Sequence, residues 1–217
     1  MKIVLLPVKG FSNAKQRLAG TLNPDQRKGL AQAMLRDVLA AVQSSRSIDQ
    51  AIVYTASEEV RRIAKAHDLE VTPETEVGGH SSAVNLMARR LSGTASAFLA
   101  IASDLPTLTG AEIDEVLDSD LEGLVLLASR DGTGTNGVLM RPGAMIDMEY
   151  GVNSLKRHVL LAQAGGLAVD VRDVAGFSFD VDTPEDLAHL IEVAPRGGET
   201  WRWVKAMGVI EALETTR

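Results

Sequence analysis

The residues best suited to chemistry begin with a polar loop that carries three cationic side chains. The loop, residues 8–22, directly follows the apolar run at residues 3–6 and contains Lys9, Lys15 and Arg17. Lysine offers a mobile point charge, arginine offers a two-pronged donor, and backbone N–H groups in such a loop can contact phosphate oxygens. The composition predicts a loop that wraps a polyphosphate, and the alternative is an ordinary solvated basic loop.

Three aspartates stand where apolar, strand-like runs end. Asp104 follows residues 98–101. Asp180 lies near the end of residues 177–181, and Asp182 directly follows them. Mg²⁺ typically takes one or two protein carboxylates and completes its shell with water and phosphate oxygens. On a persisting strand, Asp180 and Asp182 would share one face and repel each other unless a cation lay nearby. These positions indicate a divalent-cation site, whereas the alternatives are a simple turn at Asp104 and a plain helix start after Asp182.

Two further polar segments are candidates for binding a small anion. Residues 130–137 form a glycine-rich loop in which Thr135 and Asn136 can hydrogen-bond a carboxylate or phosphate, although a hairpin-type turn explains them equally well. Residues 151–154 open a helix whose first N–H groups can bind an anion, and a plain N-cap is the alternative. The histidines show no metal-ligand spacing and are interpreted as surface or packing residues: His67, His80, His158 and His189.

These candidates need a framework, and the apolar pattern predicts one. The expected strands are residues 3–6, 52–54, 69–71, 98–101, 124–127, 137–140, 168–171 and 177–181. The expected helices begin at or near Asn23, Ser57, Ser82, Thr109, Asn153, Thr183 and Trp201. Strands that alternate with helices indicate a three-layer α/β/α sandwich around a mostly parallel, mixed, Rossmann-like sheet, with ligands at the carboxyl ends of the strands. We expect one domain over residues 1–194, followed by a linker and C-terminal helix over residues 195–217.

Composition narrows the class of protein. The chain has 217 residues, a formal net charge of −7 and no cysteine, which excludes disulfides and thiolate metal sites and argues against nucleic acid or an anionic membrane as a partner. The first residues are interrupted too early by Pro7 and Gly10 for a signal peptide, and no apolar run reaches membrane-spanning length. We therefore expect a cytoplasmic enzyme.

Taken in order, several segments resemble the guanylyltransferase family of coenzyme F-420 biosynthesis, within the wider glycosyltransferase-A-like nucleotidyltransferases. The segments are Lys15-Gln16-Arg17-Leu18, Met34-Leu35-Arg36-Asp37-Val38-Leu39, Ser103-Asp104-Leu105-Pro106, Gly134-Thr135-Asn136, Gly151 with Ser154, and Asp180-Val181-Asp182-Thr183-Pro184-Glu185-Asp186-Leu187. The last string also resembles molybdenum-cofactor and cobinamide nucleotidyltransferases, whereas Gly-Thr-Asn favours the guanylyltransferase group.

The resemblance implies transfer of GMP from GTP to 2-phospho-L-lactate, phosphoenolpyruvate or 3-phosphoglycerate, with release of pyrophosphate. It implies that Asp104 and Asp182 hold Mg²⁺ and that Lys15 and Arg17 act with them, so we expect the two carboxylates to converge within reach of one cation. The residues implied to hold the phosphoacid are Thr135, Asn136, Gly151 and Ser154. Those implied beside the nucleotide are Lys9, Gly79 and Ser81, in a segment where Gly79-His80-Ser81 replaces the usual Gly-Leu-Asn.

Two other functions stay open: a nucleotidyltransferase for molybdopterin or another cofactor precursor, and a non-catalytic nucleotide-binding module. The tail after Pro195, with Trp201 and Trp203, is a candidate contact surface of a homodimer. We also expect Lys15 to be an exposed loop residue that contributes little to folding.

Overall fold

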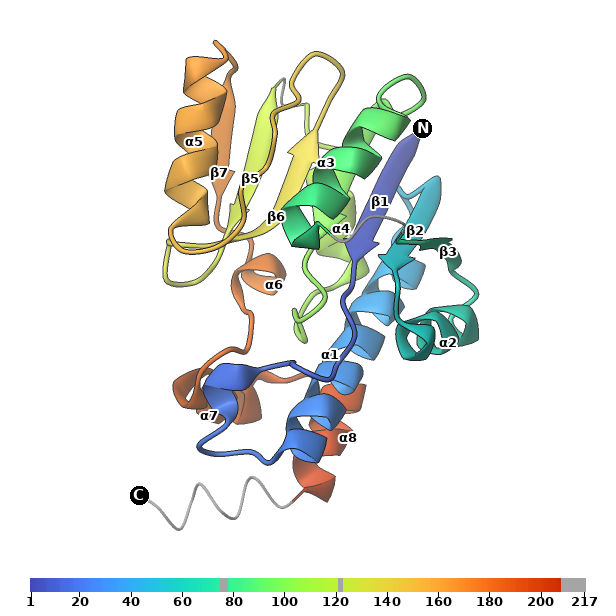
Figure 1. Ribbon diagram of the computed structural model, residues 1–217, viewed down its shortest axis with the longest axis vertical. Coiled ribbons are helices and arrows are strands. Elements are labelled where there is room, and N and C mark those ends of the chain that lie inside the picture. The colour runs from blue at the N-terminus through green and yellow to red at the C-terminus, as the bar shows by residue number, and fades with distance from the viewer. Residues whose placement is uncertain (75–77, 121–122, 208–217) are drawn as a thin grey trace.

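The computed structural model describes residues 1–74, 78–120 and 123–207. Within these ranges seven strands form one twisted sheet in the order β3-β2-β1-β4-β6-β5-β7 (Figure 1). β6 runs antiparallel to its neighbours β4 and β5, and the other paired strands are parallel. The strands are β1 (Lys2–Pro7), β2 (Gln50–Thr55), β3 (Glu70–Pro73), β4 (Ala97–Ile101), β5 (Leu124–Ala128), β6 (Thr135–Met140) and β7 (Val169–Arg172).

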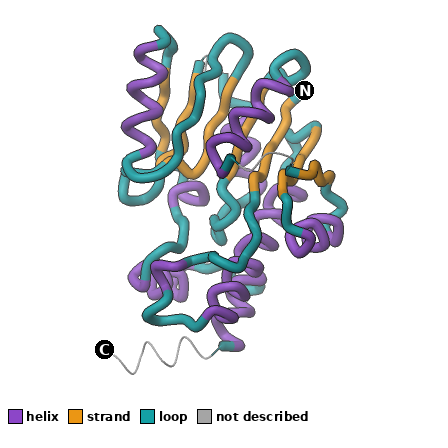
Figure 2. The backbone as a smooth tube through the Cα atoms, in the orientation of Figure 1, coloured by secondary structure: helices purple, strands orange, loops and turns teal. Residues whose placement is uncertain are grey.

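Helices cover both faces of this sheet, which confirms the predicted three-layer sandwich (Figure 2). Alternate strand residues point to opposite faces, so Ile3 and Leu5 pack with α3 and α5, whereas Val4 and Leu6 pack with α1, α2 and α4. The helices are α1 (Pro24–Ser44), α2 (Glu58–Ala66), α3 (Gly79–Leu91), α4 (Gly110–Leu117), α5 (Ser154–Ala164), α6 (Ala175–Ser178), α7 (Pro184–Val193) and α8 (Glu199–Ala206), with a 3₁₀ turn, η1 (Gln16–Leu18).

Local sequence signals define several helix starts. Asn23, Thr109 and Thr183 each accept the N–H of the third helical residue, and that residue's side chain accepts the N–H of the cap in return. This reciprocal pair satisfies two backbone donors that the helix itself leaves free, and an N-cap of this kind contributes about 1 kcal/mol. The predicted starts at these three positions are confirmed.

The predicted strand at residues 177–181 is wrong. Residues 175–178 form the short helix α6, and the chain then runs without a strand partner to the start of α7. Phe179 and Val181 are buried in a separate apolar cluster among η1, α1, α7 and α8. The alternation of apolar and acidic residues therefore reflects an extended connection that buries every second side chain, not a strand of the sheet.

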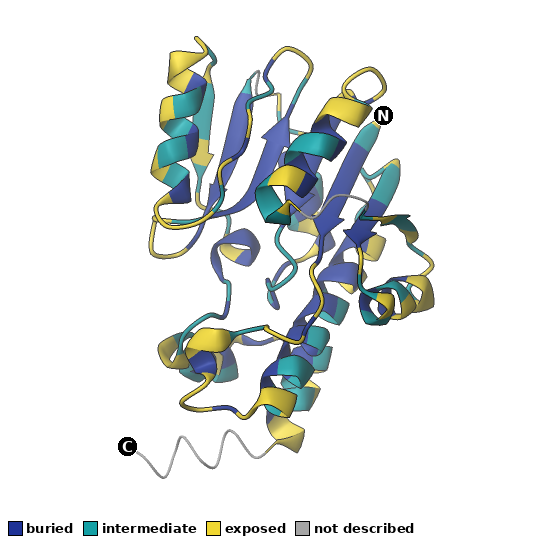
Figure 3. Cartoon of the chain, in the orientation of Figure 1, coloured by how far each residue is buried: buried dark blue, intermediate teal, exposed yellow. Residues whose placement is uncertain are grey.

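This connection leads from the sheet to a helical group beyond the carboxyl ends of the parallel strands (Figures 1 and 3). The helical group consists of η1, α7, α8 and the first half of α1. α8 packs on α1, where Trp203 lies against Gly29 so closely that an added Cβ would meet the indole nitrogen at 2.5 Å. The Asp37 carboxylate of α1 accepts the backbone N–H groups of Glu199 and Thr200 at 2.7 and 2.8 Å. The described part of the tail is thus bound to its own chain.

Two smaller outcomes complete the comparison with the predicted elements. The C-terminal helix predicted to begin near Trp201 begins earlier, at Glu199, and the residues after 207 lie outside the described ranges. None of the described helices is both long enough and apolar enough to cross a membrane.

Candidate active site

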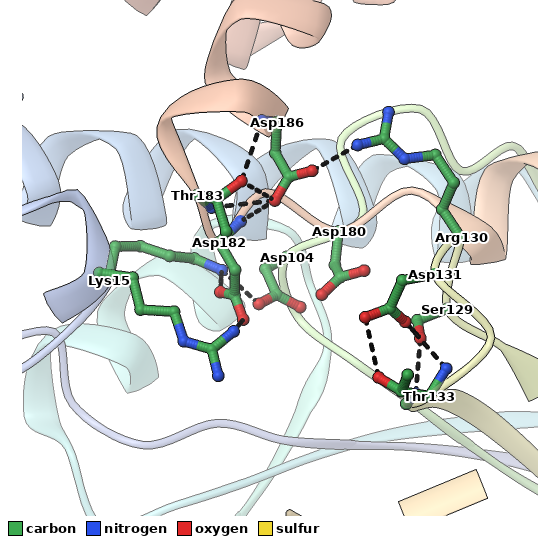
Figure 4. A network of polar contacts seen from close by, with 12 residues as sticks. Lys15, Asp104, Ser129, Arg130, Asp131, Thr133, Asp180, Asp182, Thr183 and Asp186 are labelled. Carbon is green, nitrogen blue, oxygen red and sulfur yellow. Dashed lines mark hydrogen bonds and ion pairs between the residues drawn. The ribbon is translucent and has the colours of Figure 1, made fainter. Parts of the chain in front are cut away.

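Three segments distant in sequence meet beyond the carboxyl ends of β1 and β4. The loop after β1 brings Lys15, the loop after β4 brings Asp104, and the connection into α7 brings Asp182 (Figure 4). The Lys15 ammonium donates to Asp104 Oδ2 at 2.5 Å and to Asp182 Oδ1 at 2.8 Å. The two carboxylates therefore converge on one cation, as the family resemblance led us to expect, although Asp182 follows the extended connection after α6 and not a strand of the sheet.

Lys15 is not the exposed loop residue that the sequence led us to expect. Its side chain is only 7% exposed, and its backbone lies in the left-handed region with φ 52°. It immediately precedes η1, whose Leu18 is fully buried in the helical group. Burial of Leu18 holds the turn against the protein, so the lysine side chain lies in the site instead of extending into solvent.

The charges of this centre depend on one another. Burial by itself would lower the pKa of Lys15, but the nearby carboxylates of Asp104 and Asp182 outweigh it and raise that pKa above its ordinary value. Burial would likewise raise the pKa of Asp104, and the Lys15 ammonium outweighs it and holds that pKa below its usual range. Lys15 and Asp104 are therefore both charged at neutral pH, and each favours the charged form of the other.

A further carboxyl group adds to the negative charge. Burial, followed by the charge of Asp104, raises the pKa of Asp180 to about 6, although the Asn136 amide donates to this carboxyl at 3.0 Å and opposes the shift. The guanidinium of Arg17 lies 3.9 Å from Asp182, and its side chain is 70% exposed. Lys15 is thus the cation most closely held by this acidic group, which leaves a surplus of carboxylate charge.

Two cavities are lined by residues of this centre. The first, of about 590 Å³, is lined by the loop after β1 and by Ser103 and Asp104. The second, of about 710 Å³, is lined by Arg17, by residues of the loop between β5 and β6, and by the segments before α5 and α7. Asp182 lines both cavities. The arrangement suits a reaction between two ligands that meet at the Lys15 centre.

The predicted anion-binding residues are only partly gathered in the second cavity. Asn136 and Gly151 line it, and the Asn136 amide also donates to the carbonyl of Phe177 at 2.9 Å. Thr135 and Ser154 are buried next to these positions, at 6% and 3% exposure. Successive residues at the start of β6 thus face in different directions, because strand side chains alternate.

The start of α5 is not a plain side-chain N-cap. Asn153 precedes it with φ 54° and makes no side-chain cap. The N–H groups of Ser154 and Leu155 already donate to the carbonyls of Gly151 and Thr133, both at 3.1 Å. The bond from Leu155 joins the first turn of α5 to the loop between β5 and β6, so the two walls of the second cavity are fixed to each other.

Of the three predicted nucleotide residues, one lines the first cavity and one lies beside it. Lys9 lines it, and a Cβ added at Gly79 would stand 3.6 Å from the Lys9 ammonium. Ser81 makes a structural contact instead, because its hydroxyl accepts the backbone N–H of Tyr150 at 3.0 Å. That bond ties the first turn of α3 to the loop that carries Gly151.

Sequence reasoning treated His158 as a packing residue, and the structure gives it a more specific place. The ring is fully buried, and its Nε2 accepts the backbone N–H of Glu149 at 2.9 Å. Burial, followed by the charge of Arg157, lowers the pKa of His158 to about 4. The neutral ring must then carry its proton on Nδ1, which lies 2.9 Å from the Thr135 hydroxyl and donates to it. No spacing in the sequence signals these contacts, since folding alone brings the three residues together.

With this geometry established, comparison with known proteins decides the family. Residues 1–216 match the protein family described as "Guanylyl transferase CofC like". This chain belongs to that family. The match covers the described part of the tail together with the sheet and the site.

Relatives in the family carry three different names. The chain is 36% identical to the phosphoenolpyruvate guanylyltransferase of Conexibacter woesei, over 89% of this chain and 90% of the relative. It is 33% identical to the 2-phospho-L-lactate guanylyltransferase of Methanothermobacter thermautotrophicus, over 86% and 82%. It is 32% identical to the 3-phospho-D-glycerate guanylyltransferase of Phenylobacterium zucineum, over 89% and 90%.

The fold also has a close match among solved structures. A nucleotide-diphospho-sugar transferase, named as putative, from Desulfovibrio desulfuricans G20 superposes with a TM-score of 0.76 at 15% identity, covering 95% of both chains. At that identity the likeness concerns the fold alone, and it agrees with the predicted nucleotidyltransferase architecture.

Proposed function

We propose that this protein transfers GMP from GTP to a small phosphorylated carboxylic acid and releases pyrophosphate. The observation that carries the proposal is the Lys15 centre, bonded to Asp104 and Asp182 where the two cavities adjoin. Membership of the guanylyl transferase family supports GMP as the transferred group. The acceptor would be 2-phospho-L-lactate, phosphoenolpyruvate or 3-phosphoglycerate, the acids that relatives are named for, and the reaction would serve coenzyme F-420 biosynthesis in the cytoplasm.

The first cavity is the proposed GTP compartment. Lys9 and Lys15 line it, together with the backbone of residues 10–14. Two ammonium groups and a polar loop suit a triphosphate, whose negative charge must be balanced locally in a net-acidic protein. The proposed roles of Gly79 and Ser81 are to place the first turn of α3 beside Lys9 and beside the Gly151 loop.

Mg²⁺ is the proposed cofactor, and the donors at the site fit it. Asp104 and Asp182 would hold the ion, since hard carboxylate oxygens are the ligands that Mg²⁺ prefers and one or two of them suffice. Among the described residues, no set of three or more His, Cys, Asp or Glu side chains forms a metal cluster, so the remaining ligands would be water and phosphate oxygens. A bound ion would supply positive charge next to the phosphates.

The proposed chemistry requires no general base from the protein. A phosphate oxygen of the acceptor attacks the α-phosphorus of GTP, the new P–O bond forms, and the bond to the β-phosphate bridging oxygen breaks to release pyrophosphate. A phosphate anion is already nucleophilic, so positioning and charge neutralisation by Lys15 and Arg17 are the proposed contributions of the side chains. The cavity lined by both Arg17 and Asp182 is the proposed acceptor compartment.

Incubating the protein with GTP, MgCl₂ and each of the three acids tests the proposal through pyrophosphate release. We expect release with GTP and at least one acid, and loss of release when EDTA removes the metal. Turnover with CTP in place of GTP would instead favour a nucleotidyltransferase for another cofactor precursor. Binding of GTP without turnover under any of these conditions would favour a non-catalytic module.

Asn136→Ala should raise the KM for the acceptor several-fold and leave the KM for GTP nearly unchanged. The amide lines only the second cavity and holds Asp180 at 3.0 Å, so its loss alters one ligand's compartment. Steady-state measurements with each substrate varied in turn decide this. An increase confined to the KM for GTP would assign the loop between β5 and β6 to the nucleotide.

A further inference from the structure

Arg157 carries buried donors that nothing in the described part of the chain satisfies. Its Nε and Nη2 atoms are buried and have no hydrogen-bond partner. Among the described residues it also makes no ion pair. A guanidinium is always charged, and burying charged donors without a partner is costly. An anion at this position would provide the missing partner.

The guanidinium lies against the wall of the second cavity. Arg157 is the fourth residue of α5, and a Cβ added at Gly151 would stand 3.2 Å from its Nη2. Gly151 has φ 126°, a conformation that other residues rarely adopt. Gly151 itself lines the cavity. The guanidinium of Arg157 therefore lies next to a cavity-lining residue that has no side chain.

The surroundings add to the positive charge at this point. α5 begins with Ser154, Leu155, Lys156 and Arg157, and it has neither an acidic residue in its first turn nor a side-chain cap. Five other helices, α1, α2, α4, α7 and α8, each carry an acidic residue there, whereas α3 and α6, like α5, do not. Cations are unfavourable near the positive end of a helix, so the start of α5 retains positive charge that the protein does not neutralise.

The lining of the second cavity carries more acidic than basic side chains. Its lining includes five acidic residues, which are Asp131, Asp180, Asp182, Glu185 and Asp186, but only two guanidiniums, those of Arg17 and Arg130. Arg130 is already paired with Asp186 at 2.5 Å. The carboxylates would repel an acceptor that carries at least two anionic groups, and the positively charged start of α5 would attract it.

We propose that Arg157 is a binding determinant for the acceptor, whose carboxylate or phosphate its guanidinium attracts across Gly151. The inference rests on the proposed function, because it assigns the second cavity to an anionic acceptor. It goes further in naming the cation that the acceptor requires and the side of the cavity where that charge acts.

Arg157→Met tests the inference, because methionine keeps most of the length and removes the charge. We expect the KM for phosphoenolpyruvate, or for whichever acid the wild type uses, to rise about 10-fold or more. The KM for GTP should stay within about 2-fold of wild type. The melting temperature without ligand should stay the same or rise, since the free protein loses an unsatisfied buried charge.

Two matched variants separate charge from structure. Arg157→Lys retains the positive charge and should recover much of the acceptor affinity. Lys156→Met removes an exposed charge from the same helical turn and should change the acceptor KM little. A lower melting temperature in Arg157→Met with an unchanged acceptor KM would make Arg157 a structural residue and overturn the inference.

Acceptor binding can be measured without GTP, which separates this inference from the proposed reaction. Phosphoenolpyruvate, 2-phospho-L-lactate and 3-phosphoglycerate are each added to the wild type and to Arg157→Met while the melting temperature is recorded. A rise in the wild type that is lost in the variant supports the inference even if no GMP is transferred. No rise with any acid in the wild type, or an equal rise in both proteins, overturns it.

Discussion

Replacing Lys15 by alanine should lower turnover by about 10²-fold or more, the usual scale for removing one preorganised electrostatic contact. The Lys15 ammonium lies 2.5 Å from Asp104 and 2.8 Å from Asp182, so its loss removes positive charge at the proposed point of GMP transfer. Pyrophosphate release under saturating GTP and acceptor measures the effect. Lys15→Arg keeps the charge in a bulkier group and should retain more activity than Lys15→Ala.

The same substitution should also destabilise the protein, because Lys15 is buried. Removing one partner of a buried ion pair leaves charge uncompensated, and the partly exposed carboxylates reduce the cost to about 1–3 kcal/mol. Lys15 holds the pKa of Asp104 below its usual range, so its contribution is present at neutral pH and is lost as pH falls through that lowered pKa. The difference in melting temperature between Lys15→Ala and wild type should therefore persist from pH 7 down to about pH 4, the ordinary pKa of an aspartate, and shrink at lower pH.

Two results would contradict this account of Lys15. Wild-type turnover in Lys15→Ala would show that the ammonium has no part in the reaction. An unchanged melting temperature at pH 7 would show that the ion pairs of Lys15 with Asp104 and Asp182 do not form in solution as they do in the structure.

Asp182→Asn should lower turnover by roughly 10²–10³-fold, with a similar loss for Asp104→Asn. Asparagine keeps the size of the side chain and removes its charge, so the proposed Mg²⁺ site loses one of its two carboxylates. Asp182 also lines both cavities, and its substitution affects the position where the two ligands meet. We expect the Mg²⁺ concentration needed for half-maximal activity to rise in both variants.

Glu185→Gln is the matched control for the two aspartates. Glu185 lines the second cavity and is exposed, but it makes no described contact with Lys15. Its substitution removes one negative charge from the same cavity and should change turnover and Mg²⁺ dependence little. If Glu185→Gln and Asp182→Asn reduce turnover equally, the effect is one of general charge and the metal assignment fails.

The parts of this protein that the sequence determined are those that depend on local or periodic interactions. Asn23, Thr109 and Thr183 mark helix starts because a cap and its third residue bond within four positions of each other. The alternation in β1 assigns Val4 and Leu6 to one face of the sheet, since strand geometry has a period of two residues. From these elements the α/β/α class and the edge that carries the site could be predicted.

The alternating pattern predicted a strand at residues 177–181, where the structure has the end of α6 and an extended connection with alternate side chains buried. Residues 177–181 alternate because Phe179 and Val181 enter the cluster of the helical group, and no neighbouring strand pairs with them. The sequence cannot distinguish these cases, because both bury every second residue.

The tertiary structure alone decided which polar residues share the site and in what state. Lys15 and Asp182 are 167 positions apart, yet they form one ion pair, and the burial of Lys15 depends on how Leu18 packs against distant helices. The unsatisfied donors of Arg157 can be recognised only once every neighbour is known. Residue types and spacing reveal which groups are available, whereas burial and long-range contacts determine their charges, their partners and the ligand charge that they still require.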